Sequence, residues 1–186
     1  MIFIASDVHG SSANIERFYD IVKAHKQNNP DTKVVLLGDI YNHGPRNPLP
    51  EGYAPMKVAE RLNAEMEYLS AIKGNCDSEV DQMISNFEIT GDFSIEWQGR
   101  RVFFTHGHKC NPELPPQSAK EGDIVFFGHR HIQLCEKRDG VTYICVGAIG
   151  MPLAGVERSY AILDEDKIQV KSLVGDKVLL EVKLQV

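Results

Sequence analysis

The sequence lacks the features that mark membrane, secreted and nucleic-acid-binding proteins. No apolar run is long enough to cross a bilayer, and the apolar start of the chain has no basic segment, so we expect neither a membrane span nor a signal peptide. The four cysteines are scattered without a C-x-x-C pair, which favours reduced thiols over a disulfide framework or a structural zinc site. Basic and aromatic tracts are missing and the net charge is −6, which argues against a nucleic-acid partner. These absences predict a cytoplasmic protein.

What the chain does contain is the composition of an ordinary globular protein. Its 186 residues are 42% hydrophobic and 25% charged, which is enough apolar material for one sizeable core. Helical and strand patterns alternate in the first half and strand patterns dominate the second, with no linker, repeat or low-complexity segment between them. We therefore expect a single α/β domain over residues 1–186, built on two sheets with helices outside.

Two apolar strands near the start of the chain each lead directly into an aspartate. Residues 34–37 form a mostly β-branched run, typical of a strand buried on both faces, and Asp39 follows it. Residues 2–6 precede Asp7 in the same way. Helical spacing over 11–27 connects the two strands, which predicts a parallel βαβ unit. Because ligands and chemistry gather at the carboxyl ends of such strands, we expect both carboxylates at one site.

The remaining elements are predicted from the same patterns. Residues 41–55 hold four prolines and form a long loop, and loops of this length are commonly functional. The apolar Met83, Ile84 and Phe87 suit either the core or a subunit interface; we assign them to the core, and a homo-oligomer stays open. The other expected elements are helices over 55–67 and 77–84, the latter with Asp77 as N-cap, hairpins turning at Gln98-Gly99 and Asp139-Gly140, and strands over 69–72, 94–97, 100–105, 123–127, 133–137, 141–146, 159–163, 168–173 and 178–186.

Loops that follow strands carry a repeated set of carboxylate, imidazole and amide side chains. Taken singly, an aspartate after a strand is commonly a turn residue or a helix cap. Together these side chains suit divalent Mn²⁺, Fe²⁺ or Zn²⁺, and seven are too many for one tetrahedral ion. We therefore expect two ions that share a bridging carboxylate. The candidate ligands are Asp7, His9, Asp39, Asn75, His106, His129 and His131. His25 and His108 are assigned no role at this site.

The candidate ligands fall in an ordered series of short motifs. The series is Asp7-Val8-His9, Gly38-Asp39, Gly74-Asn75-Cys76-Asp77, His106 and Gly128-His129-Arg130-His131. Over the whole chain this order resembles the calcineurin-like metallophosphoesterase superfamily, and segments 38–47, 49–55 and 74–83 resemble its bacterial YfcE-type phosphodiesterases. The resemblance implies a four-layer αββα sandwich of two mixed sheets flanked by helices.

The resemblance also implies roles for the candidate ligands and a reaction. Asp39 would bridge two metal ions, most commonly Mn²⁺ in this superfamily, with Fe²⁺ or Zn²⁺ as alternatives. One ion would be held by Asp7, His9 and His131, and the other by Asn75, His106 and His129. The two ions would generate a hydroxide that attacks the phosphorus of a small phosphate diester. Arg46 would then contact the phosphate, although an ordinary solvated arginine explains this residue equally well.

Cys76 departs from the superfamily pattern, which usually has a histidine there that is thought to protonate the leaving group. A thiol, with an ordinary pKa of about 8.5, is a poorer acid at neutral pH. Either the leaving group needs little help, or another residue donates the proton, and His43 on the proline-rich loop could do so; Cys76 and His43 are therefore the catalytic candidates. This departure favours diesters with good leaving groups. A phosphomonoesterase acting on a small metabolite or a protein is the alternative. A non-catalytic scaffold, as in retromer-type relatives, is disfavoured because every ligand of the motif series is present.

Overall fold

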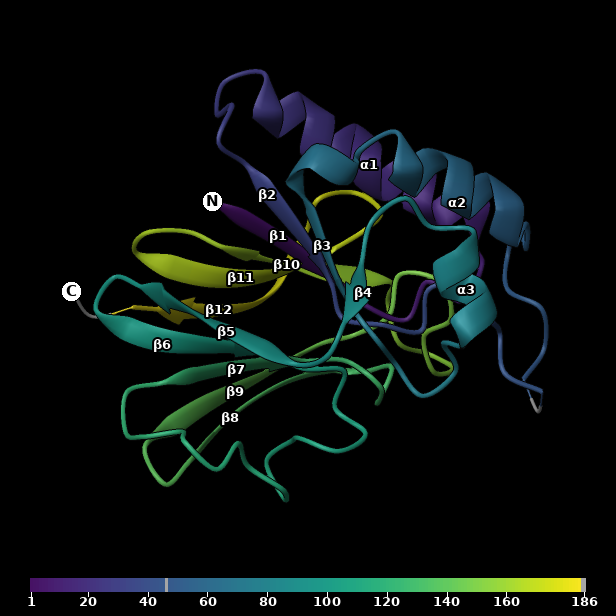
Figure 1. Ribbon diagram of the computed structural model, residues 1–186. Coiled ribbons are helices and arrows are strands. Elements are labelled where there is room, and N and C mark those ends of the chain that lie inside the picture. Colours follow the sequence, from purple (N-terminus) through teal and green to yellow (C-terminus); the bar gives the residue numbers. More distant parts are fainter. Residues whose placement is uncertain (46, 185–186) are drawn as a thin grey trace.

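Two β-sheets packed face to face form the body of the molecule, with helices on the outer side of one of them (Figure 1). The computed structural model describes residues 1–45 and 47–184. The elements in chain order are β1 (Ile2–Ala5), α1 (Ser12–Lys26), β2 (Lys33–Leu36), α2 (Pro55–Asn63), η1 (Met66–Tyr68), β3 (Leu69–Ile72), α3 (Glu79–Met83), β4 (Ile89–Thr90), β5 (Phe93–Trp97), β6 (Arg100–Phe104), β7 (Ile124–Phe127), β8 (Gln133–Arg138), β9 (Val141–Val146), β10 (Ser159–Leu163), β11 (Lys167–Ser172) and β12 (Val178–Lys183).

Both sheets mix parallel and antiparallel pairs. The seven-stranded sheet has the order β12-β11-β10-β1-β2-β3-β4, and the five-stranded sheet has the order β5-β6-β7-β9-β8. Strands β1 and β2 pair in parallel on either side of the α1 crossover, as the sequence predicts. The parallel strands β1 to β4, and the parallel strands β6 and β7, point their carboxyl ends toward the same edge of the molecule. This arrangement brings the loops of both sheets together.

The alternation of side chains along β1 shows how the sheets divide the core. Ile2 and Ile4 face the second sheet and join Phe104 and Phe126 in the cluster between the sheets. Phe3 faces the other way and packs in the cluster beneath α1 and α2. Because both faces of β1 are buried, its sequence is apolar throughout rather than alternating.

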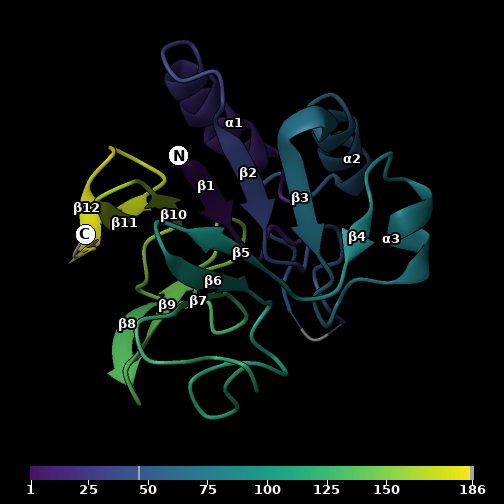
Figure 2. The same ribbon diagram turned by 60° about the vertical axis from the view of Figure 1, so that its left-hand side comes forward.

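The outer face of the five-stranded sheet is covered differently. Phe127 and Tyr143 form a third apolar cluster there with Ala119, which belongs to the segment joining β6 and β7 (Figure 2). In the described part of the chain this segment, residues 105–123, contains no helix. Its Pro112, Pro115 and Pro116 explain why, since proline removes a helical hydrogen bond. The predicted α/β fold class with two mixed sheets is confirmed. Of the four αββα layers, the helices form the one outside the seven-stranded sheet, and among the described residues the helix-free segment 105–123 takes the place of the helix layer expected outside the five-stranded sheet.

Three local predictions need correction. The helix expected over 55–67 ends at Asn63 and is followed by the short 3₁₀ helix η1. The helix expected from residue 77 is α3, which begins at Glu79 with Ser78 as its N-cap and Asp81 completing a capping box. Strand β4 was not expected, because two residues are too few to show a periodic pattern.

The prediction that Met83, Ile84 and Phe87 belong to the core is wrong for Met83. Phe87 is 8% exposed, whereas Met83 at the end of α3 is 83% exposed. A single turn of helix has too few residues to show which side faces the core. Separately, no helix among residues 1–45 and 47–184 combines the length and apolar character needed to cross a membrane.

Candidate metal centre

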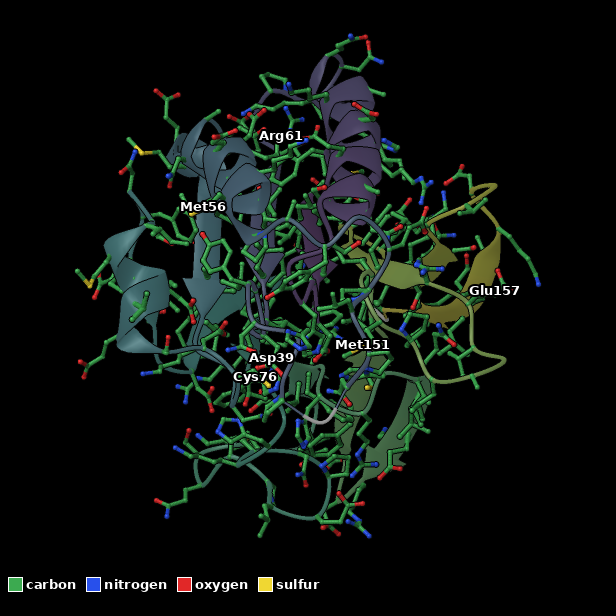
Figure 3. All side chains as sticks on the ribbon, turned by 90° about the vertical axis from the view of Figure 1, so that its right-hand side faces the viewer. Asp39, Met56, Arg61, Cys76, Met151 and Glu157 are labelled. Atoms are coloured by element: carbon green, nitrogen blue, oxygen red, sulfur yellow. The ribbon has the colours of Figure 1, made fainter. Side chains whose placement is uncertain are left out.

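Loops from both sheets meet at one edge of the molecule, and the candidate ligands gather there. Each loop follows the carboxyl end of a strand, which is where α/β sheets collect their ligands. In Figure 3 the labelled Asp39, Cys76 and Met151 lie in this region, and all three line one cavity. The strands that precede the candidate ligands are β1 for Asp7 and His9, β2 for Asp39, β3 for Asn75, β6 for His106, and β7 for His129 and His131.

The backbone of this region adopts an unfavourable conformation at several candidate ligands. Of the eight non-glycine residues with positive φ in the described chain, five are candidate ligands. Such angles are costly for residues with a Cβ and persist where the surrounding contacts enforce them, as they do at functional sites. The angles are 54° at Asp7, 48° at His9, 53° at Asp39, 65° at His129 and 56° at His131.

Asp7, His9 and His131 form the first group of converging ligand atoms. Asp7 Oδ1 lies 3.2 Å from His131 Nε2 and 3.6 Å from His9 Nε2, and the two ring nitrogens are 3.3 Å apart. The other oxygen, Asp7 Oδ2, accepts a hydrogen bond from the backbone N–H of His129 at 2.9 Å. Asp7 Oδ1 is buried and has no hydrogen-bond partner among the described residues. A buried carboxylate oxygen without a donor is the arrangement that a bound cation would satisfy.

In three of the candidate histidines, Nδ1 bonds to a backbone carbonyl, and this bond determines that Nε2 faces the other candidate ligands. Nδ1 of His9 donates to the carbonyl of Asn42 at 2.7 Å, and Nδ1 of His106 donates to the carbonyl of Leu37 at 2.7 Å. His131 donates to the Met151 carbonyl in the same way. Since Nδ1 carries the hydrogen, each neutral ring presents the lone pair of Nε2 to the centre, as metal-ligating histidines do.

Asp39 lies between two groups of candidate ligands. Its Oδ2 is 3.7 Å from His9 Nε2 and 3.5 Å from His106 Nε2, while its Oδ1 accepts a hydrogen bond from the Cys76 backbone N–H at 2.8 Å. On the far side, Asn75 Oδ1 is 2.9 Å from His106 Nε2. The ring of His129 lies 5.1 Å from that of His106. A carboxylate in this position could serve both groups.

The electrostatics of the region favour positive charge. Burial acts to lower the pKa of His106, but contact with Asp39 and the charges of Asp7 and Asp39 outweigh burial and raise this pKa to about 9. His131 has its pKa raised for the same kind of reason, with burial opposed by Asp7. The imidazole, carboxylate and amide donors therefore fit divalent cations, which supply such charge without a proton.

Asp77 has a different role from the helix N-cap predicted for it. Its two carboxylate oxygens accept hydrogen bonds from the backbone N–H groups of Asp39 at 2.7 Å, Ile40 at 2.8 Å and Gly74 at 2.7 Å. Burial outweighs these bonds and raises the pKa of Asp77. The side chain thus ties the loop after β2 to the loop after β3. In the sequence, only the position of Asp77 at the end of the Gly74–Asp77 motif indicated that it lies near the candidate ligands.

His108 lies nearer to the candidate ligands than expected. Its ring centre is 5.3 Å from that of His106 and 6.1 Å from that of His129. Its Nδ1 is buried and has no hydrogen-bond partner within the described residues. The two-residue spacing from His106 was visible in the sequence, but the spacing alone does not show the direction of a side chain on a loop.

The two candidate proton donors occupy different surroundings. The Cys76 thiol has ligand atoms of His9 and Asp39 within 4.8 Å, and burial followed by the Asp39 charge raises its pKa to about 12. His43 packs on Tyr53, with ring centres 5.1 Å apart and Nδ1 3.3 Å from the tyrosine hydroxyl. Arg46, the candidate phosphate contact, lies outside the described residues.

A Gly74→Ala substitution should disrupt this centre, because a Cβ on Gly74 would lie 2.1 Å from Asp39 Oδ1 and 2.4 Å from the Asp39 backbone nitrogen. We expect Mn²⁺ affinity to fall by about 10-fold or more, the range seen when groups that orient ligands are disturbed. Titration calorimetry on the metal-free protein measures this affinity. Gly91→Ala is the matched control, since nothing lies within 4 Å of a Cβ there. Equal affinities of the two variants would contradict the expectation.

Comparisons with known proteins agree with the motif order. The sequence matches the calcineurin-like phosphoesterase superfamily domain over residues 1–167. It is 40% identical over 184 residues to phosphodiesterase YfcE of Escherichia coli (strain K12), which covers 98% of this chain and 97% of that protein. It is 29% identical over 182 residues to phosphodiesterase MJ0936 of Methanocaldococcus jannaschii, which covers 93% of this chain and 98% of that protein.

Solved structures show the same likeness. The structure of YfcE, a phosphoesterase from E. coli, superposes with a TM-score of 0.90 at 39% identity and covers 99% of both chains. Vacuolar protein sorting 29 from Cryptosporidium parvum superposes with a TM-score of 0.58 at 15% identity, covering 100% of this chain and 97% of that one, and shares the fold alone. Because the superfamily match spans most of the chain and the likeness to YfcE spans nearly all of it, this protein belongs to the calcineurin-like phosphoesterase superfamily.

Proposed function

We propose that this protein is a metal-dependent phosphodiesterase that hydrolyses small phosphate diesters. The observation that carries the proposal is the position of Asp39, whose Oδ2 lies 3.7 Å and 3.5 Å from the inward Nε2 atoms of His9 and His106. The similarity to YfcE and MJ0936, both named as phosphodiesterases, supports the diester as substrate class. Residues 1–186 act as one catalytic domain in this proposal.

The candidate ligands divide into two sets around Asp39. Asp7, His9 and His131 would hold one divalent ion and Asn75, His106 and His129 the other, with Asp39 bridging; Mn²⁺ is the proposed ion. Two such ions, when bound, lower the pKa of a water and offset charge on a phosphoryl group. The chain itself holds Asp39 in place through the N–H of Cys76, and it orients the imidazoles through backbone carbonyls. Arg46 remains the proposed phosphate contact.

The proposal is tested by stripping the protein of metal and supplying Mn²⁺, Fe²⁺ or Zn²⁺ in turn. Bis(4-nitrophenyl) phosphate and 4-nitrophenyl phosphate then measure diester and monoester hydrolysis under the same conditions. We expect Mn²⁺-dependent cleavage of the diester at a kcat/KM well above that of the monoester. Cleavage of the monoester alone would make the protein a phosphomonoesterase. Failure to cleave either, with two ions demonstrably bound, would favour a scaffold.

The proton donor can be identified by comparing two variants. In His43→Ala we expect turnover to fall, most for a diester with a poor leaving group, if this ring supplies the proton to the leaving group. A Cys76→Ser variant tests the alternative, since it replaces the thiol with a hydroxyl of similar size. Activated 4-nitrophenyl and unactivated ethyl diesters are compared, because loss of an acid matters more for the poorer leaving group. An unchanged pH profile in either variant removes that residue from the mechanism.

A further inference from the structure

Two cavities of different chemistry adjoin the candidate metal centre. One, of about 410 Å³, is lined by His9, Asp39 and His131 together with an apolar segment. The other, of about 620 Å³, is lined by Lys73, Lys109 and His108, among others. Asn75, a candidate ligand, lines both cavities, so they are neighbours at this residue. A phosphate diester has two ester arms, and each cavity could receive one of them.

The first cavity has an apolar wall. Met151, Pro152 and Leu153 form this wall on one side, and Pro48 lies among the lining residues. Leu153 is 54% exposed, so its side chain is available to cover an apolar group. Arg130 also lines this cavity, but its guanidinium pairs with Glu113. The cavity therefore suits an aryl or alkyl arm better than a charged one.

The second cavity is lined by two lysines that are free to pair with a ligand. Neither the Lys73 nor the Lys109 ammonium forms an ion pair within residues 1–45 and 47–184. Two carboxylates line the cavity as well. Asp77 is 7% exposed and directed at three backbone N–H groups, whereas Asp92 is exposed and accepts the hydroxyl of Thr105, so the exposed lining holds two ammonium groups and one carboxylate. This cavity suits an arm with a negative charge of its own.

We infer that the substrate is an asymmetric phosphate diester, with one apolar arm against Leu153 and a second arm that carries an additional negative charge between Lys73 and Lys109. The inference rests on the proposed phosphodiesterase function and adds a substrate class to it. Lys73 and Lys109 contact the substrate away from the phosphoryl group, so they bind its ground state and transition state alike. They determine specificity and take no part in bond breaking.

The test uses a set of diesters that share a 4-nitrophenyl leaving group and differ in the second arm: ethyl, 2-carboxyethyl and 2-(trimethylammonio)ethyl. At constant ionic strength, we expect the wild type to favour the carboxyethyl diester. Lys73→Gln and Lys109→Gln should each reduce kcat/KM for that diester about fivefold, the size of one solvent-exposed charge contact. The loss should appear in KM rather than kcat, and the ethyl diester should change by less than about twofold.

Two controls separate the cavities. Lys33→Gln removes a lysine at the start of β2, at the opposite end of that strand from Asp39, and should leave every diester unchanged. Leu153→Ala should reduce kcat/KM about threefold for all the 4-nitrophenyl diesters, whatever the charge of the second arm, because it shortens the apolar wall.

The outcomes distinguish failure of the inference from failure of the proposed function. If the metal-loaded wild type cleaves none of the diesters, the phosphodiesterase function itself is wrong. If it cleaves them at rates independent of the charge of the second arm, or if the two lysine variants affect the ethyl and carboxyethyl diesters equally, the function stands and the inference is overturned. A preference for the trimethylammonio diester would also overturn it.

Discussion

An Asp39→Asn variant is expected to lose diester hydrolysis by about 1,000-fold or more, because it removes the proposed bridging charge. The change is nearly isosteric. The new amide oxygen can still accept the Cys76 N–H at the Oδ1 position, while the amide NH₂ replaces Oδ2, which faces His9 and His106. That NH₂ group has no lone pair to offer a cation and carries no charge.

Two measurements on this variant separate metal loss from misfolding. Elemental analysis after reconstitution with Mn²⁺ should find fewer ions per chain than in the wild type, and far-UV circular dichroism should be unchanged. Asp31→Asn is the control, since Asp31 is exposed and lies in the turn before β2, away from the centre. Retention of two ions together with near-wild-type kcat/KM would remove Asp39 from the proposed mechanism.

An Asp77→Ala variant is expected to lose both stability and activity, although Asp77 is not a candidate ligand. It would leave the backbone N–H groups of Asp39, Ile40 and Gly74 without their acceptor. Each buried donor without a partner costs about 1–3 kcal/mol, so we expect the free energy of unfolding to fall by about 3–5 kcal/mol. Because Asp39 is held by these contacts, kcat/KM should fall by about 100-fold in addition.

The stability of Asp77→Ala is best measured by urea unfolding in the presence of a chelator, so that metal binding does not add to the free energy of unfolding. Asp77→Asn is the graded comparison, because its amide keeps one oxygen for two of the donors and presents an NH₂ group to the third. We expect it to lie between alanine and the wild type. Glu79→Gln, on the exposed start of α3, serves as the control. An unfolding midpoint for Asp77→Ala equal to that of Glu79→Gln would show that the three contacts do not stabilise the fold.

The strands and hairpins were predictable because their signals are local. An apolar run with β-branched residues, such as Val34-Val35-Leu36, favours a strand wherever it lies in the chain. The hairpin between β5 and β6 turns at Gln98-Gly99, with φ angles of 50° and 75°, and such paired positive angles favour glycine at the second position. The superfamily motifs are also local, which is why the candidate ligands could be named from sequence.

Asp77 shows the limit of such signals. The sequence around Asp77 predicts that this residue is a helix N-cap, but the N-cap of α3 is the next residue, Ser78. The partners of Asp77 in the β2 loop, Asp39 and Ile40, are 38 and 37 residues away. They come within reach only because β2 and β3 pair in parallel in the register Val34↔Leu69. No pattern within a short window carries that information.

The sequence by itself determined the superfamily, the two-sheet fold class, the candidate ligands and most of the strands, because each depends on local propensity or on a short motif. Only the tertiary structure decided which carbonyls orient the imidazoles, what Asp77 holds and how Asn75 comes to line two cavities. These features are distances between loops that follow different strands, some in one sheet and some in both. Such distances follow from strand pairing and from packing of one sheet on the other, which many residues far apart in the chain determine together.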